Sequence, residues 1–149
     1  MSFNVQSLTK HTNLIRNDKN FTSADIIICG ETWATETDYL LIENFELSIH
    51  TPHEVNRKPQ GVSIYILKNL LLNVTNLGSH VFVDQKHRID VAFFKIFNYT
   101  IVGVYAKPHT PLSLWEEFFK YIPSLIAKDI LIIGEFNIDS ANKKKVCTI

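Results

Sequence analysis

The sequence predicts a mixed α/β domain, and three of its features support that prediction. Two short apolar runs rich in β-branched residues, at 26–29 and 130–133, are typical of strands buried on both faces. Between residues 110 and 125 the apolar residues recur instead at helical spacing. The chain has 149 residues, 46% of them hydrophobic and 20% charged, which suits one globular domain and excludes a disordered chain.

The first part of the chain predicts strands separated by one helix and one loop. Residues 2–5 form a short candidate strand, and residues 9–20, polar apart from one apolar pair, predict a surface helix. The run at 26–29 predicts the first buried strand. In residues 45–50 apolar and polar side chains alternate weakly. Residues 51–61 contain two prolines and a glycine and therefore predict a loop.

The middle of the chain is strand-forming. Residues 62–67 and 71–77 predict two strands joined around Lys68. Residues 88–97 and 99–105 are strongly β-forming, and the tight turn expected at their Asn98-Tyr99 junction makes them the best hairpin in the chain.

A helix is predicted after residue 109. Thr110 is suited to the N-cap and Pro111 to the first helical position, and Pro123 is expected to kink or end the helix. The strand at 130–133 follows. The apolar face of this helix is expected to pack in the core: Leu114, Trp115, Phe118, Phe119, Ile122 and Leu125.

Charge and cysteine content exclude several classes of function. Fifteen Lys and Arg balance fifteen Asp and Glu, so charge-driven binding of nucleic acid in the manner of a histone is not expected. The two cysteines make no disulfide framework, and Cys29 lies in an apolar run, where it is expected to be buried. The start of the chain shows no signal peptide, and no apolar run is long enough for a membrane span. These features predict an intracellular protein, nuclear or cytoplasmic, that is neither secreted nor held in a membrane.

Both buried strands stop at a glycine followed at once by a glutamate, Glu31 or Glu135. A carboxylate at a strand end is held rigidly yet reaches solvent, and ligands of α/β sheets gather at such ends. Asn4, at the end of the first strand, and Asn137, two residues after Glu135, could join the same edge. Carboxylate and amide oxygens suit Mg²⁺ or Mn²⁺. The alternative is that the two glutamates only cap or solvate their strands.

Five segments in order resemble the endonuclease/exonuclease/phosphatase superfamily, especially the apurinic-type endonuclease domains of retroelements and some Helitron transposons. The similarity extends from Ser2 to about Asp139. It rests on Phe3-Asn4-Val5-Gln6-Ser7-Leu8, Asp25-Ile26-Ile27-Ile28-Cys29-Gly30-Glu31-Thr32-Trp33, Gly61-Val62-Ser63-Ile64-Tyr65, Gly103-Val104-Tyr105-Ala106-Lys107-Pro108 and Ile133-Gly134-Glu135-Phe136-Asn137.

The resemblance implies a four-layer α/β/β/α sandwich and Mg²⁺-dependent hydrolysis of phosphate esters. It implies that Glu31 binds the metal and that Asn4 supports the metal and the phosphate. Tyr105 would contact the phosphate. Glu135 stands where the family has an aspartate that orients or deprotonates the attacking water, and Asn137 would help to hold that carboxylate and the phosphate.

The chain also departs from the family pattern. The family has Gly-Asp-x-Asn where this chain has Gly-Glu-Phe-Asn, and the longer side chain moves the carboxylate by about 1 Å or more. None of the six histidines lies in the family's final Ser-Asp-His motif. The expected architecture is therefore a partial sandwich lacking its C-terminal third, with a truncated domain at 1–139 and a polar tail at 140–149.

These features leave more than one function open. The first is a Mg²⁺-dependent phosphodiesterase of endonuclease type acting on DNA, with impaired or no activity. The second is a non-catalytic transposon-derived relic or binding module, and the third is a small-molecule phosphatase of the same superfamily. Arg57, Lys58 and Lys107 could face a phosphate backbone or could be scattered surface charge. Unpaired sheet edges would favour self-association.

Overall fold

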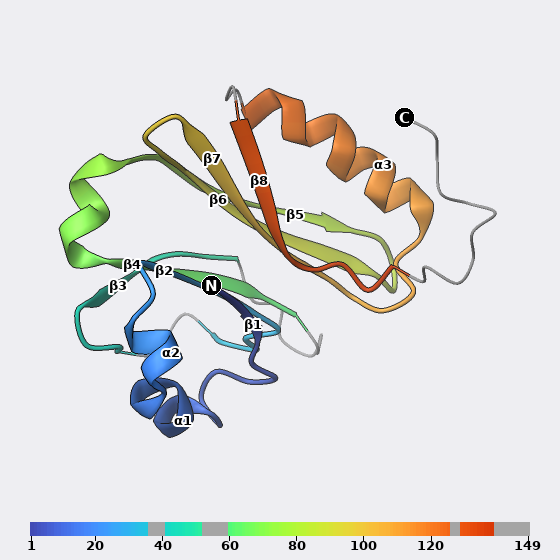
Figure 1. The fold of residues 1–149 in the computed structure, drawn as a ribbon. Coiled ribbons are helices and arrows are strands. Elements are labelled where there is room, and N and C mark those ends of the chain that lie inside the picture. Colours follow the sequence, from blue (N-terminus) through green and yellow to red (C-terminus); the bar gives the residue numbers. More distant parts are fainter. Residues whose placement is uncertain (36–40, 52–59, 126–128, 139–149) are drawn as a thin grey trace.

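The protein is a sandwich of two β-sheets with helices on both outer faces (Figure 1). This computed structural model describes residues 1–35, 41–51, 60–125 and 129–138. Within those residues the first sheet has the strand order β1-β2-β4-β3, and the second has the order β5-β6-β7-β8. The four-layer α/β/β/α arrangement expected from the sequence is therefore confirmed. The tail at 140–149 lies outside the described residues.

The elements comprise two runs of three consecutive strands, β2–β4 and β5–β7, with helical segments before, between and after them. They are β1 (Ser2–Asn4), α1 (Thr12–Asn17), α2 (Lys19–Thr22), β2 (Ile26–Gly30), β3 (Phe45–His50), β4 (Val62–Leu67), the 3₁₀ helix η1 (Lys68–Asn73), β5 (Val74–Val83), β6 (Arg88–Ile96), β7 (Tyr99–Ala106), α3 (Leu112–Tyr121), the 3₁₀ helix η2 (Ile122–Leu125) and β8 (Asp129–Glu135).

In the first sheet, β2 lies between β1, to which it is parallel, and β4, to which it is antiparallel. Its β-branched residues are buried on both faces, as predicted. Ile27 and Cys29 pack under the α1–α2 helices, and Ile28 packs against the second sheet. The helix predicted at 9–20 is instead two short helices. Asp18 separates them because its backbone is extended and its side chain accepts a 2.8 Å hydrogen bond from the amide of Asn20.

In the second sheet, the β6–β7 hairpin is confirmed, although its turn lies one position earlier than expected, at Phe97 and Asn98. The strand predicted at 71–77 is partly wrong. Residues 71–73 belong to η1, which carries the chain from the first sheet to the second, and the strand proper begins at Val74. Leu72 is almost fully exposed in this connection, because neither sheet extends to cover it.

Helix α3 covers the outer face of the second sheet (Figure 1). The α-helix ends before Pro123, as predicted, and continues as a 3₁₀ turn. Thr110 does not cap it: the N-cap is Pro111, and the Thr110 hydroxyl donates to the carbonyl of Lys107 at 2.5 Å. Within the expected apolar face Phe119 is the exception, since its side chain is largely exposed.

Strand β8 differs from the buried strand that its composition predicts. It pairs in parallel with β7 and is the last strand of its sheet among the described residues. Ile130 and Ile132 pack toward α3, whereas the side chain of Leu131 is 49% exposed. An edge strand has one partner strand and partial cover, so its alternate residues remain open to solvent.

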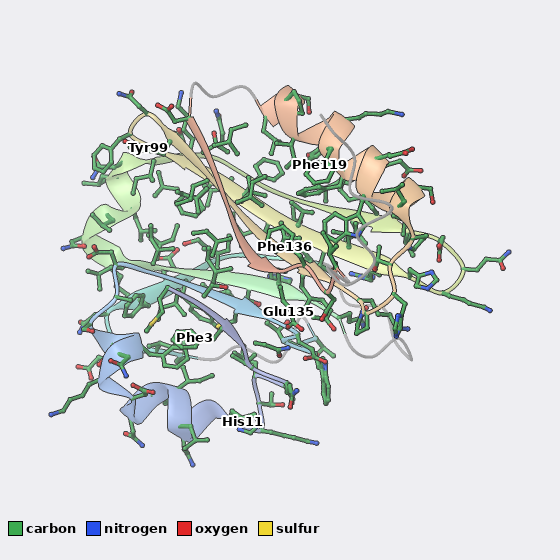
Figure 2. The ribbon with its side chains drawn as sticks, turned by 45° about the vertical axis from the view of Figure 1, so that its right-hand side comes forward. Phe3, His11, Tyr99, Phe119, Glu135 and Phe136 are labelled. Atoms are coloured by element: carbon green, nitrogen blue, oxygen red, sulfur yellow. The ribbon has the colours of Figure 1, made fainter. Side chains whose placement is uncertain are left out.

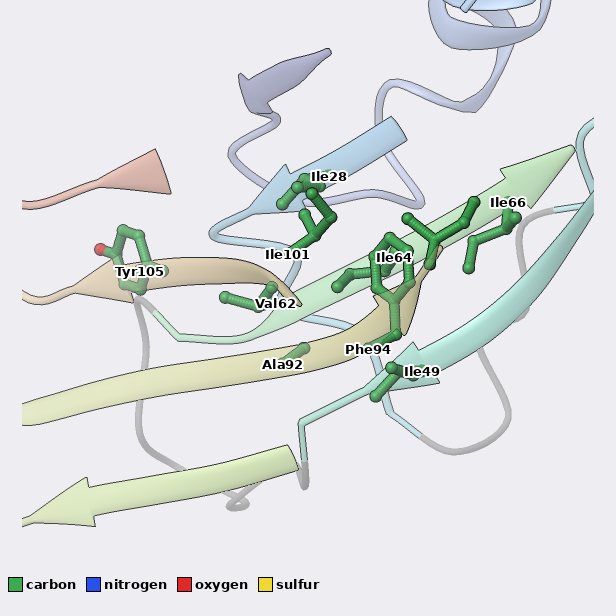
Figure 3. Packing of buried hydrophobic residues seen from close by; sticks show 10 residues of the cluster. Ile28, Ile49, Val62, Ile64, Ile66, Ala92, Phe94, Ile101 and Tyr105 are labelled. Atoms are coloured by element: carbon green, nitrogen blue, oxygen red, sulfur yellow. The ribbon is translucent and has the colours of Figure 1, made fainter. Parts of the chain in front are cut away.

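The layer between the two sheets is a close-packed apolar core (Figure 3). Ile64 of β4 and Phe94 of β6 are fully buried in it. None of the helices in the described ranges is long and apolar enough to cross a membrane.

Candidate active site

The last residues of two edge strands from different sheets meet at one end of the sandwich. β1 ends at Asn4, and β8 ends at Glu135, which is labelled in Figure 2. The side-chain amide of Asn4 donates a hydrogen bond from Nδ2 to Oε2 of Glu135, although 131 positions separate the two residues. The Oδ1 atom of Asn4 accepts a hydrogen bond from the backbone amide of Gln6 at 3.1 Å, which orients the side chain. Two halves of the chain thus share this site.

Glu31 lies at the same end of the first sheet, directly after β2. Asn4 pairs with Gly30 in the β1–β2 ladder, so Asn4 and Glu31 occupy neighbouring strand ends, as expected. Glu31 is only 8% exposed, and its backbone is left-handed, with φ of 56°. The amide of Ser7 donates to its carbonyl at 3.0 Å. A non-glycine residue in this conformation is strained and is held by its surroundings.

Tyr105 connects the two glutamates. It pairs with Glu135 in the β7–β8 ladder, and its hydroxyl lies close enough to Glu31 for the two side chains to interact. Burial raises the pKa of Tyr105 well above its usual value, and the negative charges of Glu31, Glu135 and Asp90 raise it further. Tyr105 therefore remains a neutral hydrogen-bond donor.

The backbone conformation at position 134 explains why a glycine precedes Glu135 in β8. Its φ is +152°, and a Cβ atom at this position would lie 1.8 Å from the carbonyl oxygen of Val104. Only glycine allows the backbone to approach β7 this closely, and the approach sets the position from which Glu135 extends.

The other predicted residues have different places. The side-chain amide of Asn137 donates to the carbonyl of Ala106 at 2.9 Å, and so it holds the segment after β8 against the end of β7. The ammonium group of Lys107 donates to the carbonyl of Lys86 at 3.2 Å, on the β5–β6 turn. Arg57 and Lys58 lie outside the described residues.

A buried ion pair that the sequence did not predict lies beneath this site. Arg88 and Asp90 lie on the face of β6 that packs against the first sheet, and Asp90 is fully buried. Nη2 of Arg88 donates to Oδ1 of Asp90 at 2.7 Å, and the amide of Gly61 donates to Oδ2 at 3.0 Å. The signal was an Arg-x-Asp pair at the start of a strongly apolar strand, because alternate residues share one face.

The carboxylates of Glu31 and Glu135 suit a hard cation. The polar groups beside them, the Asn4 amide and the Tyr105 hydroxyl, are neutral. Within the described residues no group of three or more His, Cys, Asp or Glu side chains is placed to hold a metal ion. Carboxylate and amide oxygens are the donors that an ion such as Mg²⁺ takes, one or two at a time, while it keeps most of its ligands as water.

The arrangement of sheets and helices is shared with several solved structures. NExo, a 3′ phosphatase from Neisseria bound to a product DNA hairpin, matches with a TM-score of 0.65 and 13% identity, over 95% of this chain and 58% of that chain. TDP2 from C. elegans matches with a TM-score of 0.59 and 10% identity, over 99% of this chain and 49% of that chain. The endonuclease domain of TRAS1, a telomere-specific non-LTR retrotransposon, matches with a TM-score of 0.56 and 15% identity, over 94% of this chain and 60% of that chain.

These matches show that the chain has the fold of the endonuclease/exonuclease/phosphatase superfamily, as the sequence motifs imply. The chain spans about half to three fifths of the length of these structures. No family model and no curated protein sequence matches it.

Proposed function

We propose that the chain carries a divalent-metal phosphodiesterase site of the endonuclease type, acting on DNA. The observation that carries this proposal is the meeting of Asn4, Glu31, Tyr105 and Glu135 at one end of the sandwich. It brings two carboxylates, an amide and a neutral hydroxyl to one place, and these groups are suited to phosphate-ester hydrolysis with Mg²⁺ or Mn²⁺.

Each side chain has a distinct role in this proposal. Glu31 and Asn4 hold the cation, which when bound neutralises charge that develops on the phosphate. Glu135 orients the attacking water and accepts its proton, and the Asn4 amide fixes the carboxylate for that task. Tyr105, kept neutral by its raised pKa, donates a hydrogen bond to a phosphate oxygen. Asn137 keeps the end of β8 in register with β7.

DNA is the proposed substrate class. Support comes from structural neighbours, one bound to a product DNA hairpin and one an endonuclease domain. Lys107 lies one residue beyond β7, at the same end of the sandwich as Tyr105, and we assign it to the phosphate backbone. We assign Arg57 and Lys58 the same role from the sequence. We also propose that the protein acts inside the cell, in the nucleus or the cytoplasm.

We expect the isolated chain to cleave DNA weakly or not at all. Glu135 has one methylene more than the family's aspartate, and no histidine of this chain follows a Ser-Asp pair. The loss of a positioned acid–base group typically costs about 10²–10⁴-fold in rate. These departures favour a second candidate function, a transposon-derived module that binds without catalysis.

Calorimetric titration with Mn²⁺ tests the metal site directly. The wild-type chain should bind Mn²⁺ weakly, and Glu31→Gln should bind about tenfold more weakly still. Glu46→Gln, on the exposed face of β3, is the matched control and should bind as the wild type does. Equal binding by all three chains would remove Glu31 from the site.

The activity is tested with plasmid DNA and abasic-site duplexes in the presence of Mg²⁺. Weak nicking that requires Mg²⁺ agrees with the proposed phosphodiesterase. Mn²⁺ binding without any nicking favours the binding module instead. Robust metal-dependent nicking that Glu31→Ala abolishes would contradict the binding-module alternative.

We further propose that the chain self-associates through the outer edge of β8. Leu131 is half exposed on this edge strand, and unpaired strand edges pair readily with another chain. Light scattering over a dilution series should show association, which Leu131→Lys should reduce. A monodisperse monomer at all concentrations would refute this proposal.

A further inference from the structure

We propose that Asp90, neutralised by Arg88, is a positioning residue that holds Glu31 in place through the backbone of Gly61. This inference rests on the proposed function, because it assigns Asp90 a role at that same site. Asp90 belongs to the second sheet and Glu31 to the first, so the proposed linkage crosses the layer between them.

The carboxylate of Asp90 is held in a fixed position. It is fully buried and both oxygens are hydrogen-bonded: Nε of Arg88 lies 2.9 Å from Oδ1 and 3.0 Å from Oδ2. The amide of Gly61, which precedes β4, donates to Oδ2 at 3.0 Å. A buried carboxylate without these partners would be costly, so the bonds determine where the Gly61 backbone lies.

The second step leads from Gly61 to the residues that follow Glu31. The carbonyl of Gly61 accepts a hydrogen bond from the amide of Thr32 at 3.3 Å, and the carbonyl of Gln60 accepts one from Trp33 at 3.0 Å. The φ of Gly61 is +103°, and a Cβ atom there would lie 2.4 Å from Oγ1 of Thr32. Any shift of Gly61 is therefore passed on to the Thr32 segment.

The third step is the strained backbone of Glu31, which this segment restrains from two sides. On one side, the amides of Ser7 and Leu8 donate to the carbonyls of Glu31 and Thr32 at 3.0 and 2.8 Å. On the other side, the carbonyl groups of residues 60 and 61 accept hydrogen bonds from the amides of residues 33 and 32. Asp90 holds this backbone in place through the amide of Gly61. A left-handed non-glycine residue persists only where its surroundings over-determine it. Loss of the Asp90 anchor should free Glu31 on one side.

A role in stability alone does not explain the pair. A buried ion pair contributes little net stability compared with apolar side chains of similar volume. Phe94 is an example of a residue that contributes to stability alone. It lies four positions further along β6, on the same face, and is equally buried. Substitution of Phe94 should weaken the core without touching the Gly61 linkage.

The experiment compares Asp90→Leu, which removes the oxygen that accepts from Gly61, with Phe94→Leu. Amide hydrogen exchange at Thr32 and Trp33 should become about tenfold faster in Asp90→Leu, relative to amides in the centre of β6 and β7. Mn²⁺ affinity should fall about tenfold, as is typical when a partner of a metal ligand is lost. Phe94→Leu should change exchange evenly across both sheets and leave Mn²⁺ affinity within about twofold. Equal local exchange in the two variants would overturn the inference.

A second variant covers the case in which Asp90→Leu does not fold because Arg88 is left without its partner. The double substitution Arg88→Gln with Asp90→Leu removes both charges together with the acceptor for Gly61, and the same local exchange is expected from it. Exchange needs no metal, so it decides the role of Asp90 even if the wild type binds no Mn²⁺, a result that would refute only the proposed function. Glu31→Gln should lower Mn²⁺ affinity without accelerating exchange at Thr32, which separates the ligand from its support.

Discussion

The layer between the two sheets has an apolar end and a charged end, and the same strands supply both. Along one face of β6, Phe94 packs among aliphatic side chains, whereas Asp90, about 13 Å away at ~3.3 Å per residue, binds Arg88 and Gly61. At the apolar end, volume and shape decide the fit, so other apolar side chains of similar size would serve. At the charged end each polar atom needs a particular partner, and this is where the candidate active site lies.

The largest expected effect is at the apolar end. Phe94→Ala removes a fully buried ring from the centre of the layer, and it should lower the free energy of unfolding by about 4 kcal/mol. Urea denaturation followed by circular dichroism measures this loss. A loss below about 1 kcal/mol would show that the layer collapses around the cavity and is less rigid than its packing implies.

At the charged end, Arg88→Met should lower the free energy of unfolding by about 3 kcal/mol, because it leaves the Asp90 carboxylate buried without its cation. The double variant Arg88→Met with Asp90→Leu should recover most of that stability in the same urea experiment. It should not recover Mn²⁺ affinity. Full recovery of both would mean that the two ends of the layer differ only in polarity.

The third effect concerns the reach of the carboxylate in β8. Glu135→Asp restores the family's Gly-Asp-x-Asn spacing, and it should raise the rate of plasmid nicking by no more than about 10²-fold, since a misplacement of ~1 Å costs about that much. Glu31→Ala in the same background should abolish any gain. A fall in rate would show that the Asn4–Glu135 hydrogen bond is adapted to glutamate.

The smallest effect is a change in stability at high pH. The pKa of Tyr105 is raised in the folded protein, so the unfolded chain loses this proton first, near the ordinary value of about 10. Above that pH the unfolded state binds fewer protons, and stability falls as the pH rises. Tyr105→Phe should flatten the fall in urea midpoints between about pH 9 and 11.

Tyr121→Phe is the matched control for this measurement. Burial alone raises the pKa of Tyr121, which lies on α3, away from the glutamates. Its substitution should remove a smaller part of the pH dependence. An equal effect from both variants would show that the charges of Glu31 and Glu135 contribute little at Tyr105.

Residue types and their local spacing account for most of the secondary structure and for part of the site. The β-branched run of β2, the β6–β7 hairpin and the end of α3 before Pro123 follow from residue types within a few positions of one another. The convergence of Asn4 and Glu31 was also predictable, because both come at the ends of strands expected to share an edge.

The pairing of side chains across the two sheets could not be predicted from the sequence. The hydrogen bond from Asn4 to Glu135 and the bond from Gly61 to Asp90 join residues of different sheets. The exposure of Leu131 likewise depends on which strand comes last in a sheet. These features follow from how two twisted sheets stack, which short-range periodicity does not encode, since it records the face on which a residue lies and not its partner on the opposite sheet.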